Sequence, residues 1–201
     1  GVLRNFVMEG VDATVAAVYE RALTTLSTAG ACLVDVEIPA LSGLRALSAK
    51  GGIVAAESSA WHQALLAAKA EMYDPNVRAR IEAGKAQSAA DYLGLIDQRR
   101  ALIAAVDAAT FALDALVMPT CPIIAPPLAA FTDGEAFTRL NQQLLRNTIL
   151  GNLADRCAIS LPCHRHGEAG VGLMLVGERH GDHRLLCQAA AVEAALEPAR
   201  G

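Results

Sequence analysis

Two periodicities run through the hydrophobic and polar positions of this chain, and they predict helices and strands in alternation. Apolar residues recur at helical spacing over residues 11–29, with Asp12 near the start and Gly30 just past the end. Residues 31–39 end in alternating apolar and acidic positions, which predicts a strand. A helix, a glycine and a strand in this order are typical of an α/β fold.

Helical spacing also dominates the middle of the chain. The predicted helices cover residues 44–72, with a break near Gly51-Gly52, and residues 75–81, 88–113 and 135–151. Pro75 suits the first position of its helix, because the amide hydrogen that proline lacks would be unbonded there. Ser88, followed three residues later by Asp91, is close to a capping box at the start of the next helix.

The last third of the chain predicts short strands and a closing helix. The strands cover residues 115–118, 158–162 and 170–176, and a Pro-rich loop spans 119–134. The third strand is apolar throughout, so we expect it to be buried on both faces. After a loop at 177–181, Asp182 is the predicted N-cap of a helix over 182–196. With no repeat, low-complexity tract or linker, residues 1–201 are predicted to form one unit.

Composition limits the classes of partner. The formal net charge is -4 and the basic residues are scattered, so neither nucleic acid nor an anionic membrane is an expected partner. The most apolar window, 115–131, contains four prolines, which exclude a membrane-spanning helix there. The hydrophobic fraction is 53%, much of it alanine, and the rest fits a chain that buries an apolar face against a missing neighbour.

Two features predict a cytoplasmic location. Residues 1–30 lack the basic start and apolar core of a signal peptide. The five cysteines are odd in number and have no paired spacing, which favours reduced thiols over disulfides.

Two adjacent serines, Ser58 and Ser59, are the first candidates for a nucleophile. They lie in a predicted helix between alanines, and helix amides are already hydrogen-bonded, so no oxyanion hole can form beside them. We interpret them as small residues at a helix contact. The three lysines, Lys50, Lys69 and Lys85, stand outside any Ser-x-x-Lys motif and are expected to be solvated.

Cysteine and histidine residues offer two further chemistries, and neither has supporting spacing. Cys163 and His164 are adjacent, and neighbouring residues on a strand point to opposite faces, which disfavours a catalytic dyad. A zinc site would need three or four ligands to converge, and the sequence shows no Cys-x-x-Cys or His-x(3–5)-His spacing. We therefore predict neither a catalytic residue nor a metal site. The cysteines and histidines considered are Cys157, Cys163, His164, His166, His180 and His183.

The most specific pattern is a series of blocks between Asp114 and Val176. It begins with Asp-Ala-Leu-Val-Met-Pro-Thr-Cys-Pro and continues with Leu-Leu-Arg-Asn-Thr-Ile-Leu-Gly-Asn-Leu. Cys-Ala-Ile-Ser-Leu-Pro-Cys-His and Val-Gly-Leu-Met-Leu-Val follow. Weaker blocks precede them in order, among them Glu57 to His62 and Tyr73-Asp74-Pro75. This order of blocks resembles the C-terminal half of the amidase signature family.

The resemblance implies a fold and a reaction. The fold would be α/β, the C-terminal part of the amidase signature fold, with a mixed β-sheet flanked by helices. Members hydrolyse carboxamides through a Ser–cisSer–Lys triad in the N-terminal half, which this chain lacks, so the chain would be inactive alone. The implied partners are that N-terminal half and a small-molecule amide, with a homodimer as a further option and no cofactor. The side chains that would line the substrate pocket are Trp61, Thr120, Cys121, Ile123 and Asn147.

Departures from the family pattern bear on the subgroup. Asp155-Arg156-Cys157 stands where the family usually has glycine and proline. The subunit that amidates misacylated tRNA has an acidic residue near 145–146, where this chain has Leu145 and Arg146. The Tyr and Arg of allophanate hydrolases are also absent from residues 50–58. A broad-specificity amidase is the favoured interpretation, with an amidotransferase subunit or an amidase-derived binding module as alternatives.

Overall fold

The computed structural model describes residues 1–197. Contacts within the chain group it into two compact units, one built from residues 1–39 and from 105 onward, the other from residues 40–104. The prediction that residues 1–201 are the C-terminal half of one amidase domain stays a prediction.

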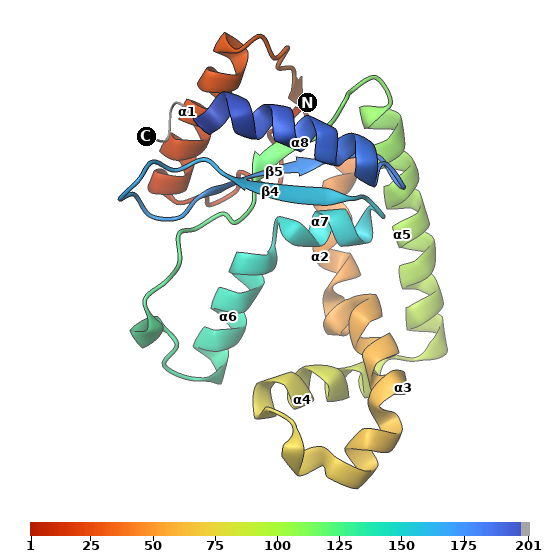
Figure 1. Ribbon diagram of the computed structural model, residues 1–201. Helices are drawn as coiled ribbons and strands as arrows, with labels where there is room; N and C mark the ends of the chain where they lie inside the picture. The colour runs from red at the N-terminus through yellow and green to blue at the C-terminus, as the bar shows by residue number, and fades with distance from the viewer. Residues whose placement is uncertain (198–201) are drawn as a thin grey trace. The chain divides into compact units, whose positions relative to one another are not determined.

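The first unit is built on a mixed five-stranded sheet. Its strands are β1 (Val2–Leu3), β2 (Asp35–Val36), β3 (Leu116–Pro119), β4 (Ala158–Pro162) and β5 (Gly172–Val176). They lie in the order β2-β1-β3-β5-β4 (Figure 1). β1 runs parallel to β2 and β3, whereas β5 is antiparallel to both β3 and β4. The predicted α/β class with a mixed sheet is confirmed.

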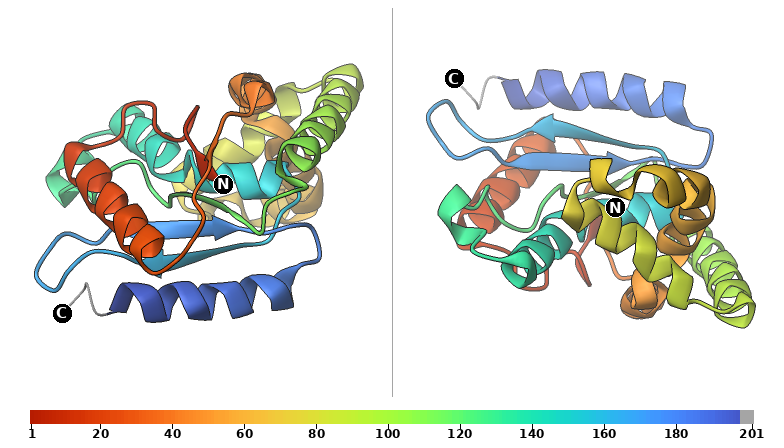
Figure 2. Two further views of the ribbon diagram at one scale, coloured as in Figure 1. Left: turned by 90° about the horizontal axis from the view of Figure 1, so that it is seen from above. Right: turned by 90° about the horizontal axis from the view of Figure 1, so that it is seen from below.

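Two helices cover one face of this sheet with the largest apolar cluster. α1 (Ala13–Thr28) contributes Val15, Val18 and Leu26, and α8 (Asp182–Leu196) contributes Leu185 and Ala189. Figure 2 shows α8 lying along β4 and β5 in both views. Leu173 to Val176 of β5 are all buried, as the apolar run predicted. Burying these side chains is the main favourable contribution to the fold of this unit.

Tyr19 joins α1 to the centre of the sheet. Its side chain is 0% exposed, and its hydroxyl donates a hydrogen bond to the Val117 carbonyl oxygen at 3.1 Å. Burial raises the pKa of the Tyr19 hydroxyl, because the phenolate would be desolvated there. The helix begins after Asp12, whose carboxylate accepts hydrogen bonds from the amides of Thr14 and Val15 at 2.7 and 3.3 Å.

The segment that departs from the family pattern is tied down by a buried arginine. The Arg156 side chain is only 8% exposed, and its Nη2 lies 2.5 Å from Asp107 Oδ1 and 3.0 Å from Thr110 Oγ1. Its Nη1 donates to the Gly177 carbonyl at 3.3 Å. Asp155 has a φ of 57°, a left-handed conformation that favours glycine but that aspartate tolerates. Arg156 therefore links residues 107–110 to the end of β5.

The second unit is helical. It contains α2 (Leu44–Leu47), α3 (Gly52–Lys69), α4 (Pro75–Glu82) and the first part of α5 (Ala89–Thr110). The predicted break before α3 is confirmed, because Lys50, Gly51 and Gly52 all have positive φ. A Cβ on Gly52 would lie 2.5 Å from the Leu47 carbonyl oxygen. Short 3-10 turns complete the chain at Pro39–Gly43, Ala49–Gly51, Ala70–Met72, Ala83–Ala86 and Leu128–Ala130.

Several predicted boundaries were wrong. The predicted strand at 31–39 pairs only through Asp35–Val36, because its neighbour β1 is itself two residues long. No sequence pattern predicted β1. The helix predicted at 135–151 is divided into α6 (Gly134–Leu145) and α7 (Thr148–Leu153). Asp182 is the first residue of α8, and Gly181 holds the N-cap position. The helix at 88–113 ends at Thr110, and the strand at 170–176 begins at Gly172.

Candidate functional site

The end of β3 holds the first group of predicted pocket residues. The Thr120 amide donates to the Gly172 carbonyl oxygen at 2.9 Å, and the Thr120 and Ser160 hydroxyl oxygens lie 2.6 Å apart. A Cβ on Gly172 would come within 2.5 Å of Ser160 Oγ and 2.7 Å of Thr120 Oγ1. Glycine at position 172 therefore leaves room for a pair of neighbouring hydroxyls from β4 and the residue after β3. The sequence analysis treated Ser160 only as a hydrogen-bonding strand residue and missed this pairing.

Asn147 lies beneath the end of β3. Its side chain is 0% exposed, and Nδ2 donates to the carbonyl oxygens of Pro119 at 2.8 Å and Val7 at 3.3 Å. Its Oδ1 accepts from Arg146 Nε at 3.2 Å. Because both sides of the amide are bonded within the protein, Asn147 positions the backbone of the loop that follows β3. Its predicted contact with substrate stays a prediction.

Arg146 reinforces the same place. Its Nη2 donates to the Val7 carbonyl oxygen at 3.0 Å, and its Nη1 donates to the Glu9 carbonyl oxygen. The guanidinium carbon lies 5.9 Å from the centroid of the Phe6 ring, within the range of a cation–π contact. Phe6 itself has a φ of 63°. The junction of α6 and α7 is thus fixed to residues 6–9 by one arginine and one asparagine.

Cys121 and Ile123 follow Thr120 along the loop and are both half-buried. Burial raises the pKa of the Cys121 thiol. A neutral thiol is a poor nucleophile, so Cys121 can contribute packing or polarity to a pocket but is not set up for attack. The loop is anchored to the start of α1, because the Asp12 amide donates to the Pro122 carbonyl oxygen at 2.8 Å.

Trp61, the remaining predicted pocket residue, lies on α3 in the helical unit. Its side chain is 82% exposed. The next residue, His62, places Nδ1 2.8 Å from the Tyr73 hydroxyl, and the two rings are edge to face. The structure therefore groups Thr120, Cys121 and Asn147 around the end of β3 in one unit and places Trp61 in the other.

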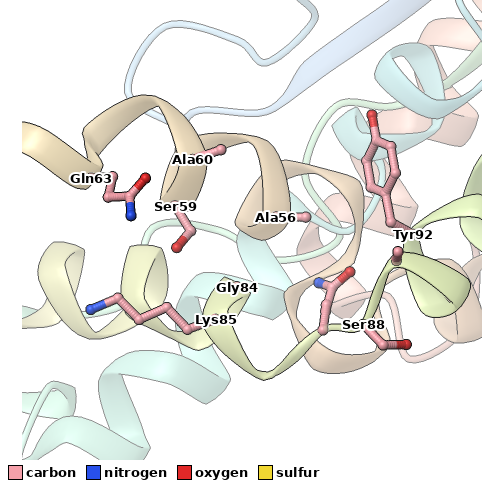
Figure 3. Close-up of a pocket in the computed structure, with 10 residues that line it drawn as sticks. Ala56, Ser59, Ala60, Gln63, Gly84, Lys85, Ser88 and Tyr92 are labelled. Carbon is pink, nitrogen blue, oxygen red and sulfur yellow. The ribbon is translucent and has the colours of Figure 1, made fainter.

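The helical unit has a pocket of its own, of about 470 Å³. Figure 3 shows Ser59, Gln63 and Lys85 among the side chains around it. One wall is a close contact between helical segments, because a Cβ on Gly84 would lie 2.0 Å from the Ala55 carbonyl oxygen. Ser58 Oγ donates to that same Ala55 oxygen at 3.2 Å. The two serines are therefore small residues at a helix contact, as predicted. The pocket is lined by Ala56, Ser59, Ala60, Gln63, Gly84, Lys85, Gln87, Ser88, Ala89 and Tyr92.

The cysteine and histidine candidates do not form a dyad. Cys163 is 5% exposed and directs its sulfur to the Val171 carbonyl oxygen at 3.5 Å. His164 Nδ1 accepts from the Val171 amide at 3.2 Å. Within residues 1–197, no three His, Cys, Asp or Glu side chains are grouped so that they could hold a metal ion. A search of the same residues found no helix with the length and apolarity needed to cross a bilayer.

Comparison with known proteins assigns the family. The sequence model of the Amidase family matches residues 1–186, and the chain belongs to that family. A solved structure described as an amidase superposes on the whole chain with a TM-score of 0.79 and 27% identity, using 45% of its own length.

Three curated relatives show how much of a full protein this chain represents. A 2-amino-5-chloromuconic acid deaminase of Comamonas testosteroni is 30% identical over 98% of this chain and 43% of its own length. An amidase of Pseudomonas putida is 32% identical over 81% of this chain and 35% of its own length. One subunit of a glutamyl-tRNA(Gln) amidotransferase from Methanospirillum hungatei JF-1 is 30% identical, over 96% and 49% respectively. The chain therefore spans less than half the length of these relatives.

Proposed function

We propose that this chain is one part of a cytoplasmic amidase that hydrolyses carboxamide C–N bonds. The Ser–cisSer–Lys triad would be carried by the remaining portion, and this chain would supply pocket walls and core. The observation that carries the proposal is a family match over residues 1–186 in a chain that spans 43% of a deaminase relative. In the complete enzyme the serine would attack the carboxamide, release ammonia or an amine, and the acyl-enzyme would then be hydrolysed.

The loop after β3 is the part of this chain that we assign to the substrate pocket. Thr120, Cys121 and Ile123 lie there in sequence, on a backbone fixed by Asn147. The Thr120 hydroxyl can donate or accept a hydrogen bond, and it is already oriented by Ser160. Side chains held in this way can position an amide without taking part in the covalent chemistry. We propose that Trp61 adds an apolar wall.

The test is ammonia release from a panel of aliphatic and aryl amides. The chain alone should be inactive, and the chain combined with the remaining portion should be active. Thr120→Val should lower kcat/KM of the combined sample about tenfold, the effect of one lost hydrogen bond. Thr24→Val is the matched control, because the Thr24 hydroxyl bonds only the Glu20 carbonyl of its own helix. Activity from the chain alone would overturn the assignment of the triad to the remaining portion.

Two alternatives are separated by the same assay. Ammonia released from glutamine alone would favour an amidotransferase subunit. Silence of the combined sample on every amide would favour a binding module derived from an amidase. Arg146 occupies the place where the amidotransferase pattern has an acid, and here its guanidinium is bonded to the Val7 and Glu9 carbonyl oxygens. A structural arginine at this position supports the amidase over the amidotransferase.

A further inference from the structure

The strand β4 lies at an edge of the sheet. Among the described residues it has one neighbour, β5, with which all five of its residues are in register. The opposite edge is β2, which has only two residues. β4 is therefore the longer of the two open edges of the sheet.

The hydrogen bonds to β5 show which backbone groups of β4 face outward. The Gly177 amide donates to the Cys157 carbonyl oxygen at 2.9 Å, and the Cys163 amide donates to the Val171 carbonyl oxygen at 3.0 Å. In an antiparallel pair, bonded residues alternate with residues that point away from the partner. Residues 157, 159, 161 and 163 therefore bond β5, and the amides of Ala158 and Ser160 point away from the sheet, as do the carbonyl groups at 158, 160 and 162.

Little protects this edge from pairing with another strand. Natural edge strands carry charged side chains, prolines or bulges that block such pairing. β4 has the sequence Ala-Ile-Ser-Leu-Pro, which contains no charge, and its proline is the last residue. Ala158 and Ser160 are both exposed.

We infer that a strand from the remaining portion of the amidase adds to β4 and continues the sheet. The inference rests on the proposed function, which supplies the partner. More than half the length of the Comamonas testosteroni relative lies outside the span of this chain, since the match covers 43% of it. Main-chain hydrogen bonds to an added strand would give two outward amides and three outward carbonyl groups the partners that β5 cannot supply.

Proline substitution tests the outward amides selectively. Ser160→Pro removes one outward amide, and Ala158→Pro removes the other, while the bonds between β4 and β5 are unchanged. Ser160→Ala is the matched control, because it deletes the hydroxyl that contacts Thr120 and keeps the amide. Thermal unfolding of each isolated variant should show that the proline and alanine variants are equally folded.

The readout is binding of the chain to the purified remaining portion, with ammonia release measured on the same samples. Each proline variant should raise Kd about tenfold, the effect of one lost hydrogen bond, and Ser160→Ala should stay within about twofold. Amide exchange at Ala158 and Ser160 should be fast in the isolated chain and slow in the complex.

The outcomes separate this inference from the proposed function. Equal Kd values for the proline variants and the control, in a sample that releases ammonia, would overturn the strand addition and leave the amidase. Weakened binding in a complex that hydrolyses no amide would support the strand addition and overturn the amidase. Failure of the unmodified chain to bind the remaining portion would overturn the strand addition. So would a homodimer of this chain that the proline variants dissociate, because the occupant of β4 would then be a second copy.

Discussion

At the scale of single residues, Asn147 is the side chain that most clearly connects sequence, packing and the candidate site. It was singled out from the sequence as a pocket residue, and the structure places it at 0% exposure beneath the loop that begins at Thr120. The carbonyl oxygens of Pro119 and Val7 both depend on its amide. A buried acceptor that loses its donor costs about 1–3 kcal/mol, which is more than the net gain from making a typical hydrogen bond.

We expect Asn147→Ala to lower the free energy of unfolding by about 2–4 kcal/mol, because it strands a buried carbonyl oxygen and leaves a small cavity. Urea denaturation followed by circular dichroism measures this change. Asn76→Ala is the control, since Asn76 is exposed on α4 and should shift stability by less than about 0.5 kcal/mol. Equal effects of the two substitutions would contradict the buried role of Asn147.

At the scale of elements, the capping box at the start of α5 was predicted and is confirmed. The Ser88 amide donates to Asp91 Oδ2 at 2.9 Å, and the Asp91 amide donates to Ser88 Oγ at 3.1 Å. Lys50 Nζ lies 3.1 Å from both carboxylate oxygens. Hydrogen bonds from the Ser88 amide and hydroxyl, then Lys50, lower the pKa of Asp91 from 3.8 to about 2. A local sequence signal was sufficient here, because all but one of the groups involved lie within four residues.

This shift predicts a pH dependence of stability. Because the folded pKa lies below the unfolded pKa, the unfolded state takes up the proton first as pH falls. The stabilisation by Asp91 is therefore complete above about pH 4 and is lost as pH falls toward 2. Carboxyl carbon NMR should give an Asp91 midpoint near 2, and Asp91→Asn should reduce the loss of stability in this window. A midpoint at the ordinary value would contradict the capping geometry.

At the scale of the whole molecule, the exposed Trp61 is the most accessible test of how this chain is completed. It is the only tryptophan, so its fluorescence reports on one position. An 82% exposed indole on α3 is an uncommon way to leave a large apolar ring, and aromatic side chains are enriched in the centres of interfaces. Its exposure is consistent with the proposal that Trp61 faces a pocket completed by the remaining portion.

We predict that Trp61 emission in the isolated chain is that of a solvated indole and is strongly quenched by iodide. Addition of the remaining portion or of an amide substrate should shift the emission to shorter wavelength and reduce quenching, because the ring becomes desolvated. Trp61→Phe provides the blank and should leave stability unchanged within about 0.5 kcal/mol. An active complex with unchanged Trp61 emission would remove Trp61 from the proposed pocket.

The sequence by itself determined the class of fold, the family and the elements whose signals are local. Helices with clear apolar spacing, the break at Gly51-Gly52 and the Ser88–Asp91 cap all depend on residues near one another in the chain. The ordered blocks from Asp114 to Val176 identified the family before any contact was known.

Tertiary structure alone decided the features that depend on residues far apart in sequence. β1 is two residues long and exists because β2 and β3 flank it, so no local period could reveal it. The helix predicted across 135–151 is interrupted where Arg146 and Asn147 bond residues 7–9 and 119, more than a hundred positions away in one case. The pairing of Thr120 with Ser160 and the open edge of β4 likewise follow from strand order. Periodicity records which face of an element is buried, whereas strand neighbours and hydrogen-bond partners are fixed only when distant segments pack together.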